Sequence, residues 1–272
     1  MWFKSGSFSG LNTDAWLINY AVGIGSTQFP SGTRLAAGSV QFTQNDLAVV
    51  RNINASGVIT ATSFVGDGSL LTNTTIKQDA DGNLFAGTGA GGSYDPTIGS
   101  ACFNIVMGCN AAGLGSLTTG GGDYNFFAGQ CSGYCNSSGS YNNFLGKYSG
   151  FKNTTGAYNN FFGSSAGYNN TTGINNNFFG NTTGFSNNSG SNNNFFGFCV
   201  GSANTSGCNN NFFGASSGAF NSVGNYNNFF GPFAGFYNSS GNYNNFLGYQ
   251  SGYNQTSGNK NLALGYNVRL PI

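Results

Sequence analysis

Glycine recurs every 17 residues over the second half of the chain, and this spacing restricts the possible folds more than any other feature. The first glycine column contains Gly129, Gly146, Gly163, Gly180, Gly197, Gly214, Gly231, Gly248 and Gly265. A second column runs in step with it from Gly133 to Gly252, and a third from Gly139 to Gly258. The consensus unit is G-x-x-[S/A]-G-[Y/F]-x-N-[S/T]-[S/T]-G-x-[Y/N]-N-N-F-[F/L]. A fixed period without insertions indicates a stack of equivalent structural units.

The composition of the unit predicts strands and corners rather than helices. Seventeen residues are too few for the common two-helix repeats, which need about 33 or more. Glycine, asparagine and threonine are poor helix formers, whereas glycine and asparagine tolerate the positive φ angles of tight corners. We therefore expect an all-β fold: a parallel β-solenoid of 17-residue turns.

Stacked turns would place each residue above its counterpart, about 4.8 Å away. One resulting column is asparagine throughout: Asn142, Asn159, Asn176, Asn193, Asn210, Asn227, Asn244 and Asn261. Such a column either forms an amide ladder, in which each side chain bonds to the next, or satisfies backbone groups at a corner. Both roles are structural.

Two aromatic columns lie next to each other in every unit. The first is Phe144, Phe161, Phe178, Phe195, Phe212, Phe229 and Phe246. The second is Leu145, Phe162, Phe179, Phe196, Phe213, Phe230 and Leu247. In an extended segment one column fills the interior and the other points outward. An outward phenylalanine column is an apolar patch of the kind that marks interfaces, so we expect a homo-oligomer with these columns along its axis. The alternative is a bend that places both rings inside one wide turn.

The polar composition argues against enzymatic chemistry. Charged residues make up 6% of the chain, where about 25% is typical. The sequence has no histidine and no glutamate, which removes Ser-His-Asp and Cys-His arrangements and the usual metal ligands. The units from Gly129 to Asn259 contain no aspartate, and no phosphate-binding G-x-x-x-x-G-K-[S/T] motif occurs. We expect a non-enzymatic protein that needs no cofactor or metal.

Net charge and hydropathy bear on the partners. The net charge is +1, so no basic patch favours nucleic acid, and no apolar run is long enough for membrane insertion. The segment "DADGN" at residues 79–83 resembles part of a calcium loop but lacks the liganding glutamate. The six cysteines form no CxxC pair; they are predicted to be free buried thiols, with disulfides between neighbouring turns as the alternative: Cys102, Cys109, Cys131, Cys135, Cys199 and Cys208.

The chain divides into four regions by pattern. Residues 1–75 form a non-repetitive region with strand-like segments that carries many of the charges, as expected of an attachment or assembly region. Residues 76–107 form a transition and cap, although "NLFAG" at residues 83–87 has the character of an earlier copy of the unit. Residues 108–265 form the repeat array, opened by a looser unit with 21 residues between Gly108 and Gly129. Residues 266–272 are expected to close the last turn as a C-terminal cap.

The repeated N-N-F-F-G segments, the S-x-A-G corners and the final "NKNLALGYNV" resemble known repeat arrays. They are similar to the head repeats of trimeric autotransporter adhesins and more so to arrays in bacteriophage tail fibres, over about residues 108–268. The resemblance implies a left-handed parallel β-roll with three chains around one axis, although the 17-residue period is longer than the turn usual in adhesin heads. "SGVITATSFVGDGSLLTN" at residues 56–73 is similar to shaft segments of phage fibres, and no autotransporter-like anchor follows the array. A virion or extracellular location is therefore expected.

Two further features concern the surface. Six asparagines begin N-x-[S/T] sequences in one column and are candidate N-glycosylation sites: Asn136, Asn153, Asn170, Asn187, Asn204 and Asn238. Asn-Ser/Thr is also good corner chemistry, which is the alternative. Tyrosines such as Tyr141 and Tyr158 are candidates for stacking on sugars or for packing.

The leading hypothesis for the function of the protein is a structural fibre subunit that associates with itself as a homotrimer, or head to tail as a filament. The alternative is an adhesin that recognises host surface glycans.

Overall fold

The computed structural model describes residues 76–79, 81–92, 101–113 and 122–271. The predicted attachment region and the shaft-like motif at residues 56–73 lie outside these residues. The described residues form twelve three-residue strands and no helix. The strands are β1 (Ile76–Gln78), β2 (Leu84–Ala86), β3 (Ile105–Met107), β4 (Phe126–Ala128), β5 (Asn143–Leu145), β6 (Asn160–Phe162), β7 (Asn177–Phe179), β8 (Asn194–Phe196), β9 (Asn211–Phe213), β10 (Asn228–Phe230), β11 (Asn245–Leu247) and β12 (Leu262–Leu264).

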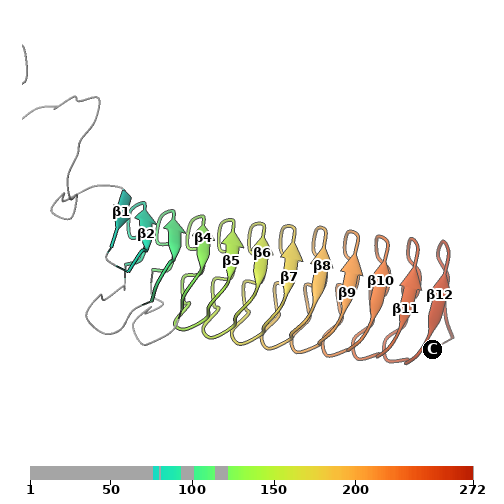
Figure 1. The fold of residues 1–272 in the computed structure, drawn as a ribbon. Coiled ribbons are helices and arrows are strands. Elements are labelled where there is room, and N and C mark those ends of the chain that lie inside the picture. Colours follow the sequence, from blue (N-terminus) through green and yellow to red (C-terminus); the bar gives the residue numbers. More distant parts are fainter. Residues whose placement is uncertain (1–75, 80, 93–100, 114–121, 272) are drawn as a thin grey trace, which may run out of the picture. The chain divides into compact units, whose positions relative to one another are not determined.

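The strands form one sheet in sequence order (Figure 1), which is the topology of a β-solenoid. From β2 to β12, successive strands are parallel, and each residue pairs with its counterpart in the next turn, as Phe161 pairs with Phe178. The predicted parallel β-solenoid of 17-residue turns is thus confirmed. Because parallel neighbours must be joined by a crossover, each turn carries the chain once around the core and returns it to the same edge.

The two ends of the stack differ from the array. β1 runs antiparallel to β2, so a hairpin covers the first turn. The parallel stack begins at β2, inside the region predicted as a transition and cap: the strand of the "NLFAG" segment pairs in register with β3, as the later copies pair with one another. At the other end Val268 and Leu270 pack against the core, and the backbone N–H of Gly252 donates to the Val268 carbonyl at 2.8 Å.

Four corner positions per turn have positive φ, two of them occupied by glycine. In the turn that starts at Gly163, φ is 141° at Gly163, 57° at Ser165, 58° at Gly167 and 57° at Asn175. A Cβ at Gly167 would overlap the ring of Phe161, so this position requires glycine for space as well as for backbone conformation. Asparagine suits the last position, yet Tyr158 holds it at 58° one turn earlier, where a bulky residue is an outlier.

Inward phenylalanines make up most of the core. Their rings stack face to face along the axis with centroid distances of 4.6–5.0 Å from Phe127 to Phe246. All are fully buried, and burial of each contributes about 1.5–3 kcal/mol. Serine hydroxyls link the two sides of the turn, as Ser149 Oγ donates to the Phe161 carbonyl at 2.9 Å.

Two asparagine columns fill much of the remaining interior and bond to neighbouring turns. In the column of Asn142 to Asn261, each Oδ1 accepts from the backbone N–H of the next asparagine, as Asn159 donates to Asn142 Oδ1 at 3.0 Å. Asn159 Nδ2 donates to the Gly173 carbonyl at 2.8 Å. This column therefore acts mainly by satisfying backbone groups, the second of the two predicted alternatives. Buried polar groups must be paired in this way.

Candidate self-association surface

The third residue of each parallel strand points away from the core, and these residues form a continuous outer apolar ladder. Its members are Ala86, Met107, Ala128, Leu145, Phe162, Phe179, Phe196, Phe213, Phe230, Leu247 and Leu264. The five rings stack with centroids 4.7–4.9 Å apart and planes within 6° of parallel. Each ring covers the face of its neighbours, so the ladder presents a row of ring edges to its surroundings.

The first residue of each strand forms a second ladder on the same outer face. From Asn143 to Asn245, each Nδ2 donates to the Oδ1 of the next asparagine at 2.8 Å. This outer asparagine ladder gives way to apolar residues at both ends: Leu84, Ile105 and Phe126 on one side and Leu262 on the other. This asparagine column was not among the predicted sites, although it is unbroken in the sequence from Asn143 to Asn245.

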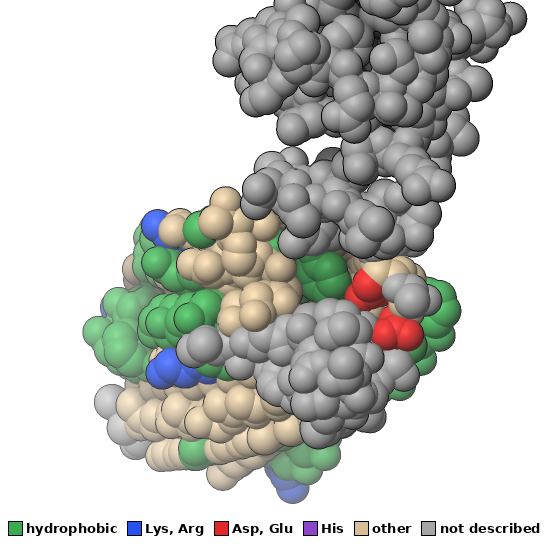
Figure 2. Space-filling view, turned by 90° about the vertical axis from the view of Figure 1, so that its left-hand side faces the viewer, with side chains coloured by type: hydrophobic (Ala, Val, Ile, Leu, Met, Phe, Trp, Pro, Cys, Tyr) green, Lys and Arg blue, Asp and Glu red, His purple; other side chains and the backbone are tan. Residues whose placement is uncertain are grey.

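The outer face of the sheet is therefore neutral along its whole length. Neither ladder contains a charged residue from β2 to β12. In the view along the stack in Figure 2, hydrophobic side chains lie in rows, with a few Lys and Arg side chains beside them. Stacked aromatics beside an amide ladder, on parallel in-register strands, are the elements from which dry interfaces between paired sheets are built. The outer face of the sheet is therefore suited to pack against a second neutral sheet face.

The two phenylalanine columns of the sequence analysis separate as an extended strand requires. The column of Phe144, Phe161, Phe178, Phe195, Phe212, Phe229 and Phe246 is the core, with no exposed surface. The column of Phe162, Phe179, Phe196, Phe213 and Phe230 is half-buried or exposed on the outer face. The alternative of a bend that encloses both rings does not occur, and only the outer column is available to a partner.

The glycosylation hypothesis is wrong for the folded chain. Asn136, Asn153, Asn170, Asn187, Asn204 and Asn238 are all fully buried. The nitrogen that would carry a glycan is already committed: Asn170 Nδ2 donates to Asn153 Oδ1 at 2.8 Å and to the Gly173 carbonyl at 3.1 Å. These six asparagines, with Asn221, form an inner amide ladder. The motif reflects corner chemistry in which the asparagine turns inward.

We expect Asn170→Asp to destabilise the fold by about 2–3 kcal/mol at neutral pH, since it leaves buried acceptors facing each other. The new carboxylate would meet Asn153 Oδ1 and the Gly173 carbonyl without a proton to donate. Burial raises the pKa of this carboxyl above its unfolded value of about 3.9. The loss of stability should therefore grow as the pH rises from about 4 and be smallest below that value. Urea denaturation at pH 4 and pH 7 measures both effects.

Asn188→Asp is the matched control, because Asn188 is exposed and its Oδ1 accepts from Thr171 Oγ1 at 2.6 Å. Aspartate keeps that acceptor in water, so the control should change the free energy of unfolding by less than about 0.5 kcal/mol. Equal losses in the two variants, or a loss at Asn170 that is independent of pH, would contradict the buried ladder.

None of the six cysteines is buried, which corrects half of the prediction made for them, and none of Cys109, Cys131, Cys135, Cys199 and Cys208 forms a disulfide. Cys109 is exposed and the others are half-buried. Burial raises the pKa of the Cys131 thiol, as does nearby Cys109, while Lys147 opposes the shift. Burial likewise raises the pKa of Cys135, against the effect of Lys152. Because a thiolate is the reactive form, neither environment activates its cysteine as a nucleophile.

The tyrosines considered for sugar stacking are exposed and themselves stacked. Tyr124, Tyr141 and Tyr158 lie at one corner with ring centroids 4.9–5.0 Å apart, and Tyr226 and Tyr243 repeat the contact further along. About half of the surface of Tyr158 is exposed. The rings therefore serve packing between turns and also offer their outer edges to solvent.

The structure also bears on metal binding, on the calcium-loop-like segment and on membrane-spanning helices. Within the described turns no group of three or more His, Cys, Asp or Glu side chains could hold a metal ion. In the acidic segment at residues 79–83, Asp79 Oδ1 accepts from the backbone N–H groups of Asp81 and Asn83. No helix long and apolar enough to cross a bilayer was found in the described part of the chain.

Comparison of the chain with protein-family models, with curated proteins and with solved structures gave no match.

Proposed function

We propose that the chain is a non-enzymatic structural subunit that builds a rod by homotrimeric association through the outer face of its sheet. The observation that carries this proposal is the outer apolar ladder, which is unbroken from Ala86 to Leu264 and lies beside a neutral asparagine ladder. Contiguous exposed apolar surface of this extent marks an interaction site. Each turn adds one apolar residue to the face, so the interface lengthens with each turn added.

Burial of the outer apolar ladder between chains would provide enough free energy to offset the entropy lost on association. Full burial of a phenylalanine is worth about 1.5–3 kcal/mol, and the outer rings retain part of their exposed surface, about 41% for Phe230. Association costs about 4–15 kcal/mol in lost freedom. Five rings, the flanking leucines and the asparagine ladder on each chain offset that cost together, whereas one or two rings would not. Three chains are proposed because the repeat resembles trimeric fibre arrays.

The setting we propose is a virion or an extracellular fibril. The fibre-like repeat supports it, together with a charged fraction of only 6%, which provides little electrostatic attraction to nucleic acid or membrane. In such a setting the solenoid would act as a spacer, and residues 1–75 would attach it to another subunit or to the next rod in a head-to-tail filament.

Light scattering of the purified chain during size-exclusion chromatography tests the proposal. We expect a mass of about three times the 28.2 kDa of one chain, maintained on dilution to micromolar concentration. A dimer would keep the face as an interface but overturn the trimer. A single chain of 28.2 kDa at all concentrations would overturn self-association altogether.

An adhesin that binds host glycans is the alternative, and the exposed tyrosine ladder at Tyr124, Tyr141 and Tyr158 favours it. Planar rings exposed at the surface can stack against the apolar face of a sugar. A glycan array probed with the intact oligomer and with a Tyr141→Ser/Tyr158→Ser variant tests this function. Binding that does not depend on the two tyrosines would remove the support that they give to the alternative.

A further inference from the structure

A third aromatic ladder lies at the corner after the second glycine column, and it is interrupted. Tyr134, Phe151, Tyr168 and Phe185 stack with centroids 5.0–5.1 Å apart, and Phe236 and Tyr253 continue the same column at 5.1 Å. Between them the two intervening turns carry Ser202 and Ala219 at the equivalent positions. The ring of Phe185 therefore has a partner on one face and none of its own column on the other.

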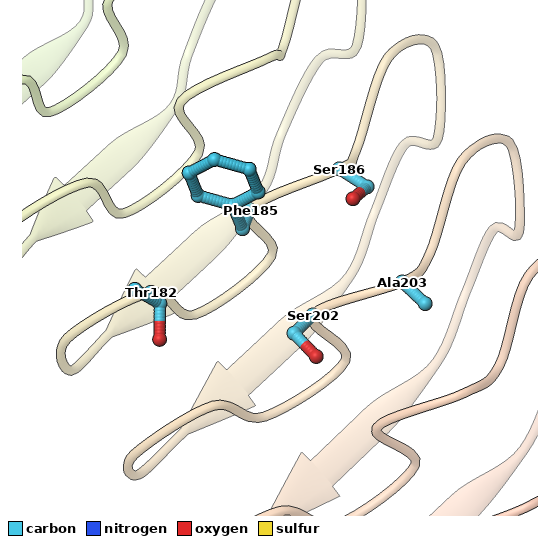
Figure 3. Close-up of a pocket in the computed structure, with 5 residues that line it drawn as sticks. All are labelled: Thr182, Phe185, Ser186, Ser202 and Ala203. Carbon is cyan, nitrogen blue, oxygen red and sulfur yellow. The ribbon is translucent and has the colours of Figure 1, made fainter.

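The structure has a pocket at this interruption. It has a volume of about 380 Å³ and is lined by Thr182, Phe185, Ser186, Ser202 and Ala203, which we call the Phe185 slot. Figure 3 shows that these residues come from two successive turns, with Ser202 in the place that a stacking ring would occupy. The backbone is the same as in neighbouring turns, since Ser186 N–H donates to the Ser202 carbonyl at 2.9 Å. The slot thus arises from the missing side chain alone.

The chemistry of the slot selects its occupant. One wall of the slot is the face of the Phe185 ring, and the small side chain of Ala203 forms another part of the lining. The other lining residues, Thr182, Ser186 and Ser202, each carry a hydroxyl group. Thr182 Oγ1 donates to the Asn181 carbonyl and also contacts Cys199 Sγ at 3.0 Å. Ser202 Oγ donates to the Ala219 carbonyl and keeps its acceptor positions free. Ser186 Oγ makes no hydrogen bond within the described residues, and no charged side chain lines the slot. An apolar wall with a few convergent polar groups is the usual composition of a small-molecule site.

We propose that the Phe185 slot binds one neutral hexopyranose ring, stacked on Phe185 and hydrogen-bonded to the hydroxyls of Thr182, Ser186 and Ser202. A sugar ring has an apolar C–H face that packs on the aromatic face and hydroxyl groups at its rim that match the hydroxyls of the slot. A flat apolar aromatic ligand would use the wall but would leave Ser186 Oγ and the free acceptor positions of Ser202 Oγ without a partner. This site is separate from the outer sheet face and from the exposed tyrosine ladder.

Saturation-transfer NMR with the full-length oligomer tests the proposal, using the methyl glycosides of glucose, galactose and N-acetylglucosamine as probes. We expect at least one of them to bind with a dissociation constant of about 1–10 mM, because a single stacked ring with few hydrogen bonds gives weak affinity. Phe185→Ala should reduce the signal about fivefold or more. Absence of binding by all three probes at 20 mM, a concentration set at about twice the weakest expected constant, would overturn the proposal.

Ser202→Phe is the decisive variant, because it fills the slot with the ring that the column lacks. We expect it to abolish glycoside binding while the melting temperature stays the same or rises, since the side chain continues an existing stack. Ser189→Phe, at an exposed position of the preceding corner, is the matched control and should bind as the native chain does. Undiminished glycoside binding by Ser202→Phe, or an equal loss of binding in both variants, would overturn the assignment of glycoside binding to the Phe185 slot.

The test is independent of the proposed structural role. Ser202 is not on the outer sheet face, so the oligomeric mass should be unchanged in Ser202→Phe. A fall in that mass would show that the slot is covered by another copy of the chain, which would overturn sugar binding there. Loss of binding at constant mass supports the slot whichever oligomer forms.

Discussion

Replacement of Phe178 by alanine should lower the free energy of unfolding by about 3–5 kcal/mol, the range measured for aromatic side chains removed from a core. Its ring is fully buried and stacks at 4.8 Å on Phe161 and at 4.9 Å on Phe195. Removal breaks both contacts in the middle of the stack. The neighbouring turns cannot move together to close the cavity, because backbone hydrogen bonds fix their spacing. Equilibrium denaturation with guanidinium, followed by circular dichroism, measures the loss.

Phe179→Ala is the control for this experiment, since it makes the same change one residue later on the opposite face of the strand. Phe179 is half-buried and its ring contacts Phe162 and Phe196 on the outer face. At a protein concentration low enough to dissociate any oligomer, this variant should lose about 1 kcal/mol, the typical cost of an ordinary substitution. Equal losses at the two positions would contradict the assignment of one column to the core and the other to the surface.

Phe196→Asp should dissociate the oligomer at concentrations where the native chain is associated, with an apparent dissociation constant raised about 100-fold or more. The change places a carboxylate in the middle of the outer apolar ladder, where a partner would remove it from water without a cation to pair with. An unpaired buried charge costs several kcal/mol. The stability of the isolated chain should fall much less, since the residue is half-buried before association. Sedimentation velocity over a concentration series measures the shift.

The matched control for the interface is Tyr158→Asp, which introduces the same charge at an exposed aromatic residue of another ladder. The oligomer should persist in this variant. If Tyr158→Asp dissociates the oligomer and Phe196→Asp does not, the chains meet at the tyrosine corner and the outer sheet face has been wrongly assigned. If neither variant changes the mass, neither aromatic ladder holds the chains together.

The sequence allowed more of the fold than of the surface to be predicted. The period, the β class and the stacking of equivalent residues follow from local chemistry, because glycine and asparagine at fixed spacing permit few other backbones. The start of the stack at β2 was harder to recognise. Its first turns are 21 residues long and carry Phe85 and Val106 in place of the regular asparagine-flanked phenylalanine. The parallel stack therefore extends beyond the part of the sequence in which the 17-residue consensus can be recognised.

The six N-x-[S/T] asparagines show where a local pattern misleads. The motif of Asn170 is identical whether its side chain faces solvent or the core, and only the path of the backbone through the corner distinguishes the two. The structure turns the side chain inward, where Asn153 and Asn187 lie one turn away on either side. Burial is a property of the stack, and no single repeat contains the partners that satisfy the amide.

The sequence by itself determined that the turns are equivalent, that strands alternate with glycine corners and that glycine, asparagine and phenylalanine each recur at fixed places in the unit. The tertiary structure decided which columns are inside. Phe178 and Phe179 are chemically the same, and their different environments follow from the direction in which the chain closes around its axis. The interruption at Ser202 is likewise visible in the sequence as one small residue, but it becomes a slot only because the turns before and after it are stacked in register.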